Sequence, residues 1–394
     1  MKGKAIKDGI YWVGAIDWNI RDFHGYKTAR GTSYNAYLIM DQKKVLVDTV
    51  KTTHTEEMLD RIKSIIDPKE IDIVISNHVE MDHSGSLPDI MKIAPDATLI
   101  TSTNGEKGLA EHYDTSKWNI KAVKSGESIN IGKRNINFVH IPMLHWPDSM
   151  VCFIPEEKLL LPNDAFGQHL ASEYLFNDQN PNDIVMEEAS KYYANIVYPF
   201  GVQVKKAIDA LSNLDIDMIA PGHGVLWRTN ISNILRKYSY WANHDNSNKA
   251  LIIYDSMWGS TEIIANTIKS SFEENDIPVV QRSLKTSHIS DIMADILESK
   301  YVAIGSPVLN NQVLPSIASL LTYMKGLKPK NKIGFAFGSY GWNPAGIKEI
   351  ESVMSGLKWD LPLSQIDTKY RPGKDDLVGI KENIDTTIKS VGID

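Results

Sequence analysis

A predicted buried strand runs directly into a cluster of metal-binding side chains, and this junction constrains the chain most. The largely apolar run Ile71–Ile75 predicts the strand, and the polar stretch Asn77–Gly85 follows it. That stretch contains four potential metal ligands: His78, Glu80, Asp82 and His83. Because side chains alternate along a strand, we expect the first three on one side, and a turn at Ser84-Gly85 brings the fourth to the same region. The alternative is a charged, solvated loop, and ligands elsewhere in the chain decide between the two.

Three further potential ligands also follow apolar strands. The predicted strand over residues 136–141 leads to His145, the strand over residues 158–161 leads to Asp164, and residues 218–220 precede His223. Gly222 and Gly224 allow the backbone around His223 to approach a site closely. A lone histidine or aspartate is more often structural than a ligand. All seven, however, lie where strands give way to turns, which is where α/β proteins place their chemistry, and this favours one metal site.

Length, charge and cysteine content exclude several classes of protein. A chain of 394 residues predicts two domains, and a net charge of -7 argues against nucleic acid as the main partner. No apolar run reaches the length of a membrane span, and the first residues lack the apolar core of a signal peptide, so we expect a cytoplasmic protein without a membrane partner. Cys152 is the only cysteine, which excludes disulfides within the chain and thiolate-ligated metal clusters. Any metal must therefore bind histidines and carboxylates.

The pattern changes after a polar stretch at residues 243–249, which reads as a linker. Beyond it, Ala250–Tyr254, Pro278–Val280, Tyr301–Gly305 and Lys332–Gly338 are predicted strands with helical segments between them. Such alternation predicts a doubly wound parallel sheet. We therefore expect two domains, residues 1–246 and residues 247–394.

The loop after the first of these strands offers hydroxyls, a glycine and the start of a helix. It contains Ser256, Met257, Trp258, Gly259, Ser260 and Thr261. Backbone N–H groups and the helix dipole suit a monophosphate there, although such a loop alone is often only a helix cap. Two later strand ends are expected to line the same site, and they contribute Pro307, Val308, Leu309, Asn310, Ser339, Tyr340, Gly341 and Trp342.

The first domain resembles the metallo-β-lactamase superfamily, an αββα sandwich that carries an H-x-H-x-D-H loop with more distant His, Asp and His ligands. In this chain Glu80 stands where that loop has its second histidine. Three carboxylates beside four histidines form a harder, more anionic set than a typical zinc hydrolase offers, and such a set suits iron. The H-x-E-x-D-H variant resembles the diiron domain of flavodiiron proteins. The residues from Ile252 to Ile268 are similar to the flavodoxin signature, and the two resemblances together cover nearly the whole chain.

The resemblance to A-type flavodiiron proteins implies two non-haem irons and FMN. It places His78, Glu80 and His145 on one iron, Asp82, His83 and His223 on the other, and Asp164 between them. It implies an oxidoreductase that passes electrons through FMN to the diiron site, which reduces O2 to water, NO to N2O, or both. It also implies a head-to-tail homodimer or a dimer of dimers, and a separate rubredoxin-type electron donor.

Two other functions are considered. A dinuclear zinc hydrolase fused to a flavodoxin-like domain would use the same fold, but Glu80 disfavours it. A binding module that has lost its catalytic sites is a weaker hypothesis, because every expected ligand position carries a residue able to bind metal. His24, Tyr193 and Trp146 are candidates for groups that orient the ligands, with ordinary packing as the alternative.

Overall fold

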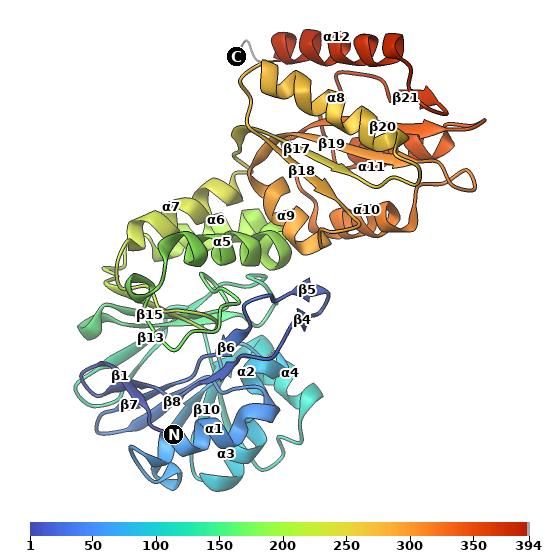
Figure 1. Ribbon diagram of the computed structural model, residues 1–394. Helices are drawn as coiled ribbons and strands as arrows, with labels where there is room; N and C mark the ends of the chain where they lie inside the picture. The colour runs from blue at the N-terminus through green and yellow to red at the C-terminus, as the bar shows by residue number, and fades with distance from the viewer. Residues whose placement is uncertain (392–394) are drawn as a thin grey trace. The chain divides into compact units, whose positions relative to one another are not determined.

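The computed structural model describes residues 1–391, and contacts between Cα atoms divide the chain into two units. The first unit contains Met1–Tyr192 and Phe200–Ser239. The second contains Tyr193–Pro199 and the residues from Tyr240 onward. Each unit is built on its own sheets (Figure 1).

Two large sheets form the centre of the first unit. The seven-stranded sheet has the order β1 (Lys4–Lys7), β2 (Ile10–Trp12), β7 (Tyr37–Met40), β8 (Lys44–Val47), β9 (Ile73–Ile75), β10 (Thr98–Ser102) and β11 (Asn119–Val123). The five-stranded sheet has the order β12 (Ser128–Asn130), β13 (Asn135–His140), β14 (Met150–Ile154), β15 (Leu159–Asn163) and β16 (Met218–Pro221). Two short ribbons, β3 (Ala15–Asp17) with β6 (Thr32–Tyr34) and β4 (Asp22–Phe23) with β5 (Tyr26–Lys27), complete the strands of this unit.

The inner strands are largely apolar, and both of their faces are buried. In β9, Ile73 and Ile75 pack between the two sheets, whereas Val74 packs under the outer helices. Those helices are α1 (Thr55–Lys63), α3 (Leu87–Ile93) and α4 (Thr103–His112). Figure 1 shows α5 (Asn182–Tyr192), α6 (Gly201–Leu211) and α7 (Ile231–Ala242) over the five-stranded sheet. The predicted αββα sandwich is confirmed.

A five-stranded parallel sheet forms the second unit. Its order is β18 (Val279–Ser283), β17 (Ser247–Tyr254), β19 (Ser299–Pro307), β20 (Ile333–Tyr340) and β21 (Ile366–Lys369). In sequence order this is 2-1-3-4-5, the flavodoxin-like arrangement, whose ligand site lies beyond the carboxyl ends of the strands.

Helices cover both faces of this sheet, as Figure 1 shows. The apolar stripes of α8 (Ser260–Glu274) and α12 (Lys374–Val391) pack with the sheet in one core, which contains Ile268 and Ile384. The remaining helices are α9 (Ile289–Glu298), α10 (Pro315–Leu327) and α11 (Ala345–Gly356). The predicted doubly wound domain is therefore confirmed, with one strand, β21, that the sequence analysis does not predict.

Candidate metal centre and flavin cavity

The loop that follows β9 turns into a short helix instead of continuing as a strand. The helix α2 (Met81–Ser84) begins after Glu80, whose carbonyl oxygen accepts hydrogen bonds from the N–H groups of His83 and Ser84, each at 2.9 Å. The Ser84 hydroxyl donates to the carbonyl oxygen of Val79 at 2.6 Å. The expected strand-like alternation through Asp82 is therefore wrong. The turn of helix sends Asp82 and His83 to one group of ligand atoms and leaves His78 and Glu80 in another.

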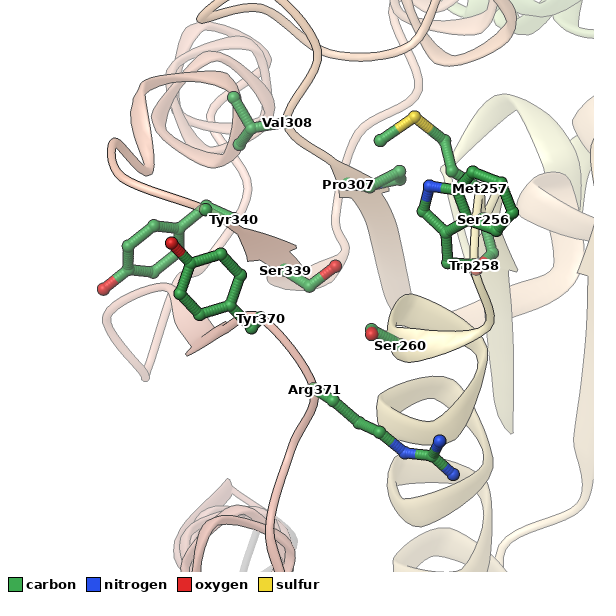
Figure 2. A pocket seen from close by; sticks show the side chains of 11 residues that line it. Ser256, Met257, Trp258, Ser260, Pro307, Val308, Ser339, Tyr340, Tyr370 and Arg371 are labelled. Carbon is green, nitrogen blue, oxygen red and sulfur yellow. The ribbon is translucent and has the colours of Figure 1, made fainter.

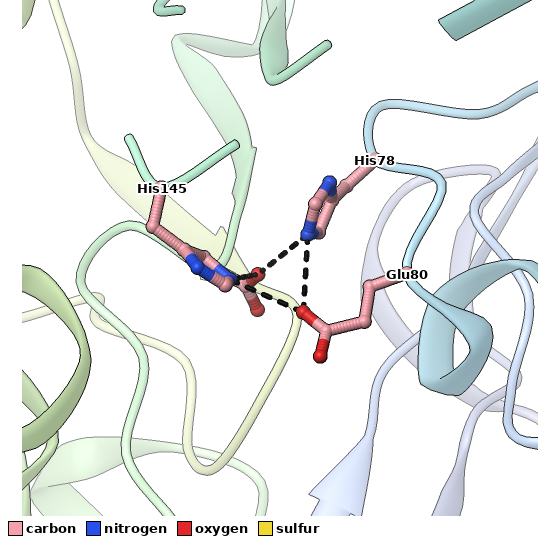
Figure 3. A group of neighbouring side chains, drawn as sticks. His78, Glu80 and His145 are labelled. Atoms are coloured by element: carbon pink, nitrogen blue, oxygen red, sulfur yellow. Dashed lines mark hydrogen bonds and ion pairs between the residues drawn. The ribbon is translucent and has the colours of Figure 1, made fainter. Parts of the chain in front are cut away.

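The first group consists of His78, Glu80, His145 and Asp164, whose ligand atoms all lie within 4.8 Å of one another. Figure 3 shows His78 and Glu80, from one loop, converging with His145 from another. The Oε2 atom of Glu80 lies 3.3 Å from Nε2 of both His78 and His145. The Nε2 atom of His145 lies 3.1 Å from Oδ2 of Asp164. Four donors from loops far apart in sequence thus surround one point.

The second group consists of Asp82, His83 and His223, which are all buried. Parallel pairing of β15 with β16 brings Asp164 and His223 to the same end of the sheet. There, Oδ1 of Asp164 lies 3.0 Å from Nε2 of His83 and 3.4 Å from Nε2 of His223, whose Nε2 is also 3.1 Å from Asp82. Asp164 therefore directs one carboxylate oxygen to each group of donors. All seven predicted ligands lie together.

Several donor atoms of these groups are buried without hydrogen-bond partners. Among residues 1–391, Oδ1 of Asp82, Oδ1 of Asp164 and Nε2 of His83 have none, although the last two lie only 3.0 Å apart. At that separation the two atoms interact as an ion pair when His83 is protonated. Buried polar atoms without partners are costly unless something else binds them. A pair of metal ions fits this donor set of imidazoles and carboxylates.

The electrostatics of the metal-free cluster support the same fit. Burial lowers the pKa of His78, but hydrogen bonds from its ring to Asp148 and Glu80 outweigh it and raise that pKa to about 10. The pKa of His145 rises to about 10 and that of His83 to about 9, because neighbouring carboxylates outweigh burial. The histidines hold the pKa of Asp164 well below its usual value, against the effect of burial. In the metal-free protein the imidazole protons therefore balance the negative charge of the carboxylates, a role that bound metal ions would take over.

The three residues considered as orienting groups lie in different surroundings. The ring of Trp146 packs edge-on against His78, with centroids 5.1 Å apart. The exposed His24 places Nε2 3.5 Å from Glu80. Tyr193 instead packs against Trp241, and it is the preceding Tyr192, the last residue of α5, whose ring faces His223 at 6.0 Å. For Tyr193 the printed ring contact is therefore ordinary packing, the alternative given above.

A second site lies at the carboxyl ends of the strands in the flavodoxin-like unit. It is a cavity of about 390 Å³, lined by Ser256, Met257, Trp258, Ser260, Pro307, Val308, Ser339, Tyr340, Gly341, Tyr370 and Arg371. Figure 2 shows the hydroxyl-bearing side chains of Ser260 and Ser339 on facing walls. Gly259 adopts a φ of 89°, a conformation that favours glycine, and α8 starts directly after it without a side-chain cap. The uncapped N–H groups fit a phosphate.

Five residues expected at this cavity do not line it. Thr261 is buried beneath it and lies 3.2 Å from the Ser339 hydroxyl, and Gly259 donates its N–H to the Ser256 hydroxyl. Leu309, Asn310 and Trp342 also lie outside the lining, and the Trp342 side chain is 82% exposed.

Two further residues line the cavity, Tyr370 and Arg371, which follow β21 and are not predicted from the sequence. A predicted strand at Ile366–Lys369 would have indicated them, but that segment is mostly polar and resembles a loop.

The fold and the two sites define a two-domain oxidoreductase with a metallo-β-lactamase-like domain and a flavodoxin domain. The family models agree: the chain matches the ODP family beta lactamase over residues 32–224 and Flavodoxin over residues 252–382. A nitric oxide reductase of Moorella thermoacetica is 45% identical over 361 residues, which cover 91% of this chain and 90% of that protein. A rubredoxin-oxygen oxidoreductase of Megalodesulfovibrio gigas is 40% identical, covering 99% of this chain and 98% of its relative.

Solved structures give the same result. The rubredoxin oxygen:oxidoreductase from Desulfovibrio gigas superposes with a TM-score of 0.97 at 40% identity, covering 100% of both chains. The flavodiiron protein from Giardia intestinalis superposes with a TM-score of 0.96 at 33% identity, covering 99% of this chain and 96% of that one. The chain belongs to the flavodiiron protein family. In the part of the chain that the structure describes, no helix has the length and apolarity needed to span a membrane.

The raised histidine pKa values predict proton release when metal binds. In metal-free protein at pH 7.5, His78, His83 and His145 are protonated, because their pKa values lie between about 9 and 10. Metal ligation requires neutral imidazole, so Zn²⁺ binding should release up to one proton from each. Calorimetric titration in buffers of different ionisation enthalpy measures this release, which should fall as the pH rises through 10. Release that is absent at pH 7.5 would contradict this account of the cluster.

Proposed function

We propose that this chain accepts electrons on FMN and uses a non-haem diiron centre to reduce O2 to water, NO to N2O, or both. The observation that carries the proposal is the position of Asp164, which directs one carboxylate oxygen toward each of two groups of donors, one buried and one partly buried. Family membership supports the same reaction, since the relatives include one named as a nitric oxide reductase and one named as a rubredoxin-oxygen oxidoreductase. A zinc hydrolase is disfavoured by Glu80 and by the flavin cavity.

The proposed assignment gives each iron its own ligands and one shared carboxylate. His78, Glu80 and His145 hold one iron, Asp82, His83 and His223 hold the other, and Asp164 bridges them. The irons supply one-electron redox chemistry and open positions for a diatomic ligand, and FMN supplies electrons one at a time. The protein residues would hold the metals among buried and partly buried ligands.

The proposed flavin site uses the cavity at the start of α8. Uncapped N–H groups of that helix and the hydroxyls of Ser256 and Ser260 suit the phosphate. Tyr340 and Tyr370, whose backbones are joined by a hydrogen bond, both line this cavity and offer apolar surface to the isoalloxazine (Figure 2). In this proposal residues 1–246 carry the irons and residues 247–394 carry the flavin.

The 394 residues contain one cysteine, too few for the four thiolates of a rubredoxin centre. We propose a separate rubredoxin-type donor in the cytoplasm and a homodimer, head-to-tail or assembled further as a dimer of dimers. Two tryptophans at or near the flavin cavity are largely exposed, Trp258 at 93% and Trp342 at 82%. We propose that the donor docks at these rings, because aromatic residues are enriched in protein interfaces.

The proposed function is tested by composition and turnover in one preparation. Purified protein should contain two irons and one FMN per chain, and it should consume NO or O2 when reduced rubredoxin is supplied. Parallel assays with NO under anaerobic conditions and with O2 establish the preferred substrate. Zinc in place of iron, or a visible spectrum without flavin, would reject the proposal in favour of a hydrolase.

Loss of the bridging carboxylate should remove metal and leave the flavin. We expect Asp164→Ala to lower iron content and abolish NO and O2 consumption, because both groups of donors share this side chain. FMN content should not change, since the cavity lies in the other unit. Iron analysis and the flavin spectrum measure the two effects. Asp89→Ala, an exposed carboxylate on α3, serves as the control, and wild-type iron content in Asp164→Ala would exclude the bridging role.

A further inference from the structure

Asp148 contacts the metal-ligand loop although it belongs to neither group of donors. One of its oxygens, Oδ2, lies 2.9 Å from Nδ1 of His78 and accepts a hydrogen bond from the N–H of Val79 at 2.8 Å. Asp148 is 4% exposed and His78 is 1% exposed, so little water competes for these hydrogen bonds. A carboxylate at the outer nitrogen fixes Nε2 as the nitrogen that faces the metal.

The same residue connects two ligand loops. Asp148 follows His145 by three residues, so its side chain joins the loop of His145 to the loop of His78. Its carbonyl oxygen accepts a hydrogen bond from the Ser102 hydroxyl at 2.7 Å, and Ser102 caps α4. The N-terminus of α4 therefore anchors the backbone of Asp148, which fixes the position of its carboxylate relative to the first group of donors.

The other group of donors lacks an equivalent anion at a ring nitrogen. Nδ1 of His223 lies 2.7 Å from the carbonyl oxygen of Ser33, which is neutral, and Nδ1 of His83 has no hydrogen-bond partner among residues 1–391. A buried carboxylate, Asp48, acts on His83 through its charge, but its hydrogen bonds come from Asn77 and Asn163. In the described part of the chain, His78 alone among the four histidine ligands has a carboxylate at its outer nitrogen.

We propose that Asp148 is a positioning residue that makes the two metal positions unequal. It orients His78, and its negative charge increases the electron density that His78 donates. The position formed by His78, Glu80 and His145 therefore binds metal more tightly and stabilises the oxidised ion more than the position formed by Asp82, His83 and His223. This inference rests on the proposed diiron function.

Two variants separate orientation from charge. Because one oxygen accepts both hydrogen bonds, Asp148→Asn can keep the geometry while it removes the charge. Asp148→Ala removes both. Asp41→Asn is the matched control, since Asp41 also accepts backbone N–H hydrogen bonds and contacts no metal ligand.

The readouts are metal affinity, measured with Zn²⁺ and a competing chelator, and the reduction potential of the iron pair, measured by EPR-monitored titration. We expect Asp148→Asn to raise the potential of the iron that is oxidised first. Asp148→Ala should bind one of two Zn²⁺ ions about 10- to 100-fold more weakly. Asp41→Asn should match the wild type in both. Weaker metal binding by folded Asp148→Asn would also support the proposal, because the lost charge is then the cause.

The proposal is overturned if folded Asp148→Asn matches the wild type in both potential and affinity, or if Asp148→Ala binds both ions as the wild type does. If neither variant folds, ¹⁵N-histidine NMR of zinc-loaded wild-type protein decides. Slowly exchanging ring N–H signals are expected from both His78 and His223, the former more deshielded because its bond is charge-assisted. Absence of the His78 signal, or a His78 signal no more deshielded than that of His223, overturns the proposal. Wild-type protein that binds no iron pair contradicts the diiron function itself, which is a separate result.

Discussion

The rest of the metal centre depends on one carboxylate, that of Asp164, which lies between two groups of histidines and acids, one buried and one partly buried. Bringing these groups out of water costs free energy that hydrogen bonds within the cluster do not fully offset, as the unpartnered atoms of Asp82 and His83 show. Cations at the two groups would satisfy these atoms. The αββα sandwich supplies the rigidity, because most of the ligands follow β9, β15 and β16, which are buried on both faces.

In the second unit the strand ends and a helix N-terminus also form a ligand site, in this case for a phosphate. Its parallel sheet ends in loops on one edge, and the N-terminus of α8 adds uncapped N–H groups to that edge. These are neutral donors, suited to a phosphate that needs orientation more than charge neutralisation. With the metal centre in the other unit, this gives the chain two separate redox sites, as its family membership implies.

The sequence predicts both folds and both sites because their strongest signals are local. Apolar strands ending in histidines, carboxylates or glycine-hydroxyl loops are readable without tertiary information, and all seven metal-site residues converge as expected. The path of the ligand loop is not readable, because α2 is a single turn stabilised by Ser84 and the Glu80 carbonyl. Tyr370 and Arg371 are missed because β21 is a short edge strand whose polar sequence resembles a loop. Asp148 acts through a contact 70 residues away in sequence, which no local pattern shows.

The central claim is that electrons enter through the flavin and reach NO or O2 only at the iron site. Its most direct test is protein stripped of FMN under conditions that retain iron, assayed with reduced rubredoxin, and assayed again after FMN is restored. The account predicts full iron content, no consumption of NO or O2 without flavin, and recovery of consumption when FMN is added. Sustained turnover by the flavin-free, iron-loaded protein would contradict it.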